Sequence, residues 1–125
     1  MVLQDFYSVD TLNSVSEGKY IASITLNKDH AIFKGHFPGN PVTPGVCMMQ
    51  IIKEITESIL KVSLTMVSTS NVKFMALINP EVNAKLTLEL EVSENEASEI
   101  KVKNTTSFDE TVALKLSNTY KKIAS

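Results

Sequence analysis

The sequence has one cysteine, no tryptophan and no long apolar run. The single cysteine, Cys47, excludes a disulfide within the chain and weakly favours a reducing compartment. No apolar run approaches the ~18–20 residues that a helix needs to cross a bilayer. The first residues are too polar and too few before Asp5 for a secretory signal. These absences predict a cytoplasmic protein that does not enter a membrane.

Positive charge is also scarce, because 12 basic residues stand against 14 acidic ones and the net charge is −2. Nucleic-acid binding normally requires a concentrated basic face, so we expect no nucleic-acid partner. The two histidines and the cysteine stand at positions 30, 36 and 47, a spacing that matches no familiar metal site. We therefore expect neither a metal nor a cofactor.

The chain length of 125 residues suits one domain with one hydrophobic core, so residues 1–125 are assigned to a single domain. Alternating side chains predict a first strand over Lys19–Asn27. Residues 30–43 contain two of the four prolines and two of the four glycines. This composition predicts a structured loop without a regular element.

A helix is expected from Pro44 to Leu60, because proline is tolerated in the first helical turn. At 100° per residue its apolar side chains fall on one arc, namely Met48, Ile51, Ile52, Ile55 and Ile59. Between Val46 and Ile52 the only polar residue is Gln50. The first half of the helix should therefore be buried on nearly all sides.

Four more strands are expected after this helix, over residues 66–77, 85–92, 99–108 and 112–117. Consecutive strands favour an antiparallel sheet, and the apolar helix must be covered by that sheet. The pattern therefore predicts an α+β domain in which an antiparallel sheet wraps around one central helix.

The segment from Phe33 to Val46 reads Phe-Lys-Gly-His-Phe-Pro-Gly-Asn-Pro-Val-Thr-Pro-Gly-Val. It resembles the signature of the 3-hydroxyacyl-[acyl-carrier-protein] dehydratases of the hot-dog superfamily. In that signature Gly-His-Phe-Pro-Gly is followed by a proline and by Pro-Gly-Val at the start of the central helix. The resemblance implies a hot-dog fold and an enzyme of fatty-acid or related acyl synthesis. Its reaction would eliminate water from a 3-hydroxyacyl thioester to give a trans-2-enoyl thioester.

The resemblance also implies roles for individual residues. His36 would be the base that removes the C2 proton, since its pKa lies near neutrality. The backbone N–H of Gly45, at the helix N-terminus, would bind the thioester oxygen. The residues expected to contact the substrate are Phe37, Pro44, Val46 and Met49.

The sequence departs from the family at the second catalytic position, fourteen residues after the histidine, where a carboxylate is usual and Gln50 stands here. Four residues further on, Glu54 replaces the usual glutamine, and residues four apart share one helix face. An amide can hydrogen-bond a hydroxyl but cannot protonate it at neutral pH. We expect Gln50 to line the site and Glu54 or a water relay to handle the proton.

Several functions remain open at this point. The chain would be a dehydratase with a modified acid, or a degenerate subunit that works with a dehydratase paralogue supplying the acid. The same fold would also suit a hot-dog thioesterase, although the resemblance implies that the Gly-His-Phe-Pro-Gly element favours dehydration. A module that binds acyl carriers without turnover is the last alternative. The expected partner is an acyl carrier protein or CoA thioester. The resemblance also implies a homo-oligomer, at least a dimer.

Overall fold

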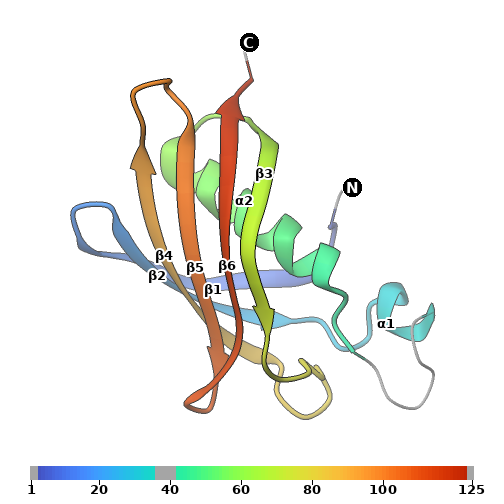
Figure 1. Cartoon of the computed structure of the whole chain (residues 1–125). Helices are drawn as coiled ribbons and strands as arrows, with labels where there is room; N and C mark the ends of the chain where they lie inside the picture. Colours follow the sequence, from blue (N-terminus) through green and yellow to red (C-terminus); the bar gives the residue numbers. More distant parts are fainter. Residues whose placement is uncertain (1–2, 36–41, 124–125) are drawn as a thin grey trace.

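The computed structural model describes residues 3–35 and 42–123. Within these residues six strands and two helices follow one another (Figure 1). Their bounds are β1 Tyr7–Ser16, β2 Lys19–Leu26, α1 Ala31–Gly35, α2 Gly45–Leu60, β3 Leu64–Phe74, β4 Lys85–Glu94, β5 Ile100–Phe108 and β6 Thr111–Lys122.

The strands form one sheet in the order β1-β2-β4-β5-β6-β3, and every neighbouring pair is antiparallel. Helix α2 lies against one face of this curved sheet (Figure 1). Strands β1 and β3 are the two sheet edges, and α2 leads directly into β3. The expected α+β architecture, a sheet wrapped around one central helix, is confirmed.

The core lies between α2 and the sheet. Along β2 and β4 every second side chain is buried, as the period of two predicts. The expected apolar arc of α2 packs against these positions, because burying both apolar faces removes them from water. Met48, Ile51, Ile52 and Ile55 are at most 2% exposed.

Two local elements differ from expectation. Strand β1 was not predicted, because most of its side chains are exposed and leave no alternating pattern. Residues 30–43 were expected to hold no regular element, yet Ala31–Gly35 forms the short helix α1. Phe33 anchors this helix, because its side chain is buried and its ring stacks on that of Phe6 with 5.0 Å between the ring centroids.

The first half of α2 is also less enclosed than expected. Cys47, Met48 and Ile51 are buried, but Val46 is 59% exposed and Gln50 is half-buried. The reason is that the sheet covers one side of the helix, so the opposite side has no covering element among the described residues. None of the helices in the described part of the chain is long and apolar enough to span a membrane.

The end of α2 provides a test of local strain. Lys61 caps the helix in the left-handed conformation, with φ 57° and ψ 40°, and its N–H donates to the Glu57 carbonyl at 2.7 Å. Side chains with a Cβ are strained there and glycine is not. We expect Lys61→Gly to raise the free energy of unfolding by about 1 kcal/mol in urea titrations. The matched control, Lys53→Gly inside α2, should lower it by about 1 kcal/mol.

Candidate active site

Helix α2 begins with two backbone donors, on Gly45 and Val46, that have no acceptor among the described residues. Pro44 precedes it in an extended conformation, with φ −62° and ψ 143°, and makes no side-chain cap. The Pro44 carbonyl accepts the N–H groups of Cys47 at 3.0 Å and Met48 at 3.2 Å. The N–H groups of Gly45 and Val46 lie in the first turn, where no intrahelical acceptor exists. With no acidic residue in that turn, the positive end of the helix dipole is left for an acceptor.

An open cavity of about 560 Å³ lies beside this helix end, lined by residues 42–45 and 74–78. Most of its lining is apolar. Thr43 is the polar exception, and its buried hydroxyl has no hydrogen-bond partner among the described residues. A ligand that fits this place has an apolar body and an oxygen acceptor directed at Gly45.

Phe74, the last residue of β3, lies against the first residue of α2. A Cβ built on Gly45 would stand 2.7 Å from Cζ of the Phe74 ring, too close for two carbon atoms. Gly45 is therefore the residue that lets this ring approach the helix backbone. Phe74 as a whole is 57% exposed, and it lines the cavity.

A second polar feature lies further along α2. The Gln50 Nε2 group donates to Oε2 of Glu54 at 2.9 Å. The Tyr7 hydroxyl, from β1, donates to Oε1 of the same carboxylate at 2.7 Å. All three residues are half-buried. Glu54 is thus held on both oxygens, one by its own helix and one by the edge strand.

Burial determines the protonation of two nearby groups. Burial raises the pKa of the Tyr7 hydroxyl, and the hydrogen bond to Glu54 raises it further. Tyr7 therefore stays protonated at neutral pH and donates a hydrogen bond to Glu54. Burial also raises the pKa of the Cys47 thiol. Cys47 is 2% exposed and packs as a small apolar side chain.

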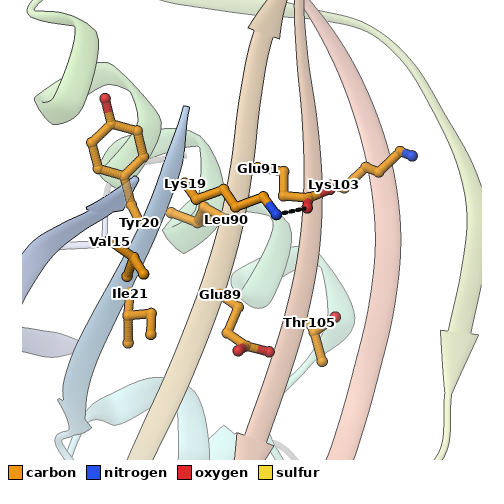
Figure 2. A pocket seen from close by; sticks show the side chains of 9 residues that line it. All are labelled: Val15, Lys19, Tyr20, Ile21, Glu89, Leu90, Glu91, Lys103 and Thr105. Atoms are coloured by element: carbon orange, nitrogen blue, oxygen red, sulfur yellow. Dashed lines mark ion pairs between the residues drawn. The ribbon is translucent and has the colours of Figure 1, made fainter. Parts of the chain in front are cut away.

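Another hollow, of about 350 Å³, lies over β2, β4 and β5. Figure 2 shows its lining, including the ion pair between Lys19 Nζ and Glu91 Oε1 at 3.5 Å. The pair is about half-exposed, so water screens it strongly. None of the expected site residues lines this hollow.

Comparisons with solved structures identify the fold. The dehydratase heterocomplex ApeI:P from Xenorhabdus doucetiae superposes with a TM-score of 0.66 at 19% identity, over 94% of this chain and 97% of that one. A hypothetical thioesterase with coenzyme A from Streptococcus pneumoniae TIGR4 superposes at 0.68 and 12% identity, over 98% and 91%. At such identities the likeness concerns the fold, which is the hot-dog fold.

The family follows from the sequence itself. A family model described as ApeI-like, ApeI dehydratase, matches residues 12–115. The chain belongs to the ApeI-like dehydratase family.

Curated relatives of this ApeI-like chain are named 3-hydroxyacyl-[acyl-carrier-protein] dehydratase FabZ. The relative from Caldicellulosiruptor saccharolyticus is 40% identical over 53 residues, which are 40% of this chain and 36% of the relative. The relative from Lactococcus lactis is 35% identical over 46 residues, 37% of this chain and 30% of the relative. The matches thus span about a third of the relatives' length. The expected resemblance to these dehydratases is confirmed.

The expected site residues fall into three groups. Pro44 and Gly45 line the cavity together. Gln50 and Glu54 contact each other but are not among the cavity's lining residues. His36 and Phe37 lie outside the described residues.

The two remaining substrate-contact residues lie apart from the cavity. Val46 is exposed and Met49 is half-buried, and neither is among its lining residues. The other histidine, His30, donates through Nε2 to the Gln4 carbonyl at 2.8 Å. Its Nδ1 accepts the Ile32 N–H at 3.1 Å, so both ring nitrogens serve the fold.

Sequence reasoning missed Tyr7 and Phe74. Tyr7 lies in the strand that carried no periodic signal, and nothing in the sequence connects it with Glu54, 47 positions away. Phe74 lies within a run of strand-forming residues. No spacing indicates that its ring would reach Gly45.

The contact between Gly45 and Phe74 can be tested by a double-mutant cycle. We expect Gly45→Ala to lower the free energy of unfolding by about 1 kcal/mol, the lower end of overpacking costs, because the exposed ring can swing aside. In a Phe74→Ala background the same change should cost nothing, since the new methyl meets no ring. Urea titrations of the four proteins give the coupling energy. Equal costs in both backgrounds would contradict the contact.

Proposed function

We propose that this chain is a cytoplasmic dehydratase of 3-hydroxyacyl thioesters, carried by an acyl carrier protein or CoA. The observation that supports this most is the apolar cavity at the free N-terminus of α2 in a member of the ApeI-like dehydratase family. An acyl chain suits the apolar lining. The thioester oxygen suits the N–H of Gly45.

In the proposed reaction His36 removes the C2 proton, and negative charge develops on the thioester oxygen. The Gly45 N–H and the dipole of α2 stabilise that charge. The C3–O bond then breaks as the C2–C3 double bond forms. The leaving hydroxide needs one proton to become water. The His36 imidazolium carries the proton taken from C2 and can transfer it to the hydroxide, so the reaction needs no further acid.

Gln50 would then bind the C3 hydroxyl without protonating it. Its amide has no transferable proton at neutral pH, whereas it can donate or accept a hydrogen bond. Loss of a general acid usually lowers the rate by about 10²–10⁴. Slow turnover is therefore the expectation for the chain acting alone.

The test offers purified protein a 3-hydroxyacyl carrier thioester and follows the enoyl product by mass spectrometry. We expect slow enoyl formation that His36→Ala abolishes. The control is His30→Gln, because the second histidine serves the fold through Gln4 and Ile32 and should be dispensable for turnover once folding is verified. Free acid and thiol without enoyl product would contradict the proposal and identify the chain as a thioesterase. Binding without any product would leave a carrier-binding module.

Gln50 also supports a second candidate, a subunit that works with a dehydratase paralogue. A structural neighbour, the ApeI:P protein, is a dehydratase heterocomplex. In that case the chain alone would be inactive and a paralogue carrying the acid would restore turnover. Gln50→Glu should then restore activity as well. The new carboxyl group would lie beside Glu54. Repulsion between two carboxylates at this distance favours a protonated form of one of them, which could serve as the acid.

We further propose that two copies of the chain associate through β3. Every β3 residue after Leu64 is exposed, including Met66, Val67 and Val72. An edge strand presents unpaired N–H and C=O groups to a second strand, and apolar side chains strengthen that contact. The exposed residues Met75 and Leu77 continue this apolar surface into the lining of the cavity. A partner copy would therefore close the cavity's open side.

The two sheet edges offer a matched comparison for self-association. Val67 on β3 is 47% exposed and Val9 on β1 is 46% exposed. We expect Val67→Lys to convert a dimer into a monomer, because a charge would be buried between the paired strands. Val9→Lys should leave the dimer intact. Light scattering after size-exclusion chromatography measures both masses. A monomeric wild type, or dissociation by Val9→Lys alone, would overturn the assignment to β3.

A further inference from the structure

Three half-buried polar side chains from two elements form one connected unit. Tyr7 of β1 donates to one oxygen of Glu54, and Gln50 of α2 donates to the other, at 2.7 and 2.9 Å. Both distances are those of good hydrogen bonds to a charged acceptor. The unit joins an edge strand of the sheet to the exposed side of the central helix.

The contacts determine which end of the Gln50 amide faces Glu54. Nε2 of Gln50 donates to the carboxylate, so the amide presents its NH₂ group to Glu54 and not its oxygen. A glutamine without such a neighbour could adopt either orientation. Here the carbonyl oxygen Oε1 is turned away from Glu54. No described residue donates to that oxygen.

Tyr7 makes this orientation more rigid. A carboxylate bound only by Gln50 could rotate and offer either oxygen to it. The Tyr7 hydroxyl occupies Oε1 of Glu54, so Oε2 is the oxygen left for the amide. Burial and Glu54 keep that hydroxyl protonated, so it remains a donor. The orientation of Gln50 thus depends on Tyr7, which lies 43 positions earlier in the sequence.

We propose that Tyr7 and Glu54 are positioning residues that hold Gln50 Oε1 as a hydrogen-bond acceptor for a ligand hydroxyl. The inference rests on the proposed function and deepens it, because it names the feature that the site selects. A 3-hydroxyacyl thioester carries a donor at C3. The saturated acyl group has none. Gln50 therefore discriminates between these ligands by binding the hydroxyl.

A purely structural role for the unit makes a different prediction. If Tyr7 only fastened the exposed strand β1 to α2, its loss would lower stability and leave ligand discrimination unchanged. The ratio of two affinities separates these roles. Ligand-independent destabilisation affects both affinities equally and cancels in the ratio.

The experiment uses two unreactive ligands on a pantetheine arm, in which an amide nitrogen replaces the thioester sulfur. One bears a C3 hydroxyl and the other is the saturated acyl group of equal length. Isothermal titration calorimetry gives both Kd values for the wild type, Tyr7→Phe, Glu54→Gln and Tyr20→Phe. Tyr7→Phe keeps the ring and Glu54→Gln keeps the shape. Tyr20 is the matched control, half-buried on β2 and without a side-chain hydrogen bond among the described residues.

For the wild type we expect the hydroxylated ligand to bind about 3- to 10-fold more tightly, the usual net value of one hydrogen bond. Tyr7→Phe and Glu54→Gln should reduce this ratio to about 1, and Tyr20→Phe should preserve it. A wild-type ratio near 1, or a ratio unchanged in both variants, overturns the inference while the proposed function stands. Failure of both ligands to bind the wild type overturns the proposed function and the inference with it.

Discussion

Covering the apolar arc of α2 is the constraint on which the rest of the structure depends. A helix with Met48, Ile51, Ile52 and Ile55 on one side cannot remain in water alone, and the burial of that side drives the association with the sheet. Six antiparallel strands supply the complementary face, with every second side chain turned inward along β2 and β4. The sheet curves around the helix and ends in the edge strands β1 and β3 (Figure 1).

The same helix forms the core and the candidate site, because the sheet covers only one side of it. Its buried arc fixes where the helix lies and how it is rotated. Its N-terminus consequently meets the end of β3, where Phe74 approaches Gly45 and the cavity opens. Glycine at this position satisfies two demands, since the ring can approach the backbone and the N–H stays accessible. The packing of the core thus places the first N–H groups of α2 beside the apolar cavity.

Gln50 stands at the position where the resemblance leads us to expect a catalytic carboxylate. In place of a carboxyl group that could exchange a proton, the helix presents an amide bound to Glu54 one turn later. The carboxylate is still present, but both of its oxygens are occupied by Gln50 and Tyr7. In the proposed site Gln50 would therefore serve hydrogen bonding and not proton transfer. This arrangement is consistent with slow elimination that relies on one base, or with an acid from a second subunit.

Much of the architecture could be predicted from local patterns. The helix from Pro44, the strand over Lys19–Asn27 and the strands after residue 85 followed from periodicity, since a buried face imposes its repeat on the sequence. The strand over residues 66–77 was predicted from its β-forming residues instead, and β3 ends earlier, at Phe74. The helix α1 and the strand β1 were not predicted. The first depends on Phe33 packing against Phe6, and the second lies at an exposed edge. A pattern of burial can be read only where an element has a buried side.

The residues of the candidate site also differ in whether the sequence alone could indicate them. The sequence by itself determined the motif around Gly45 and the exchanged pair Gln50 and Glu54, because both are encoded within a few helical turns. Only the tertiary structure decided that Phe74 lies over Gly45 and that Tyr7 holds Glu54. Phe74 lies 29 positions after Gly45, and Tyr7 lies 47 positions before Glu54. These contacts arise from how the sheet closes around the helix, and no local repeat in the sequence records that closure.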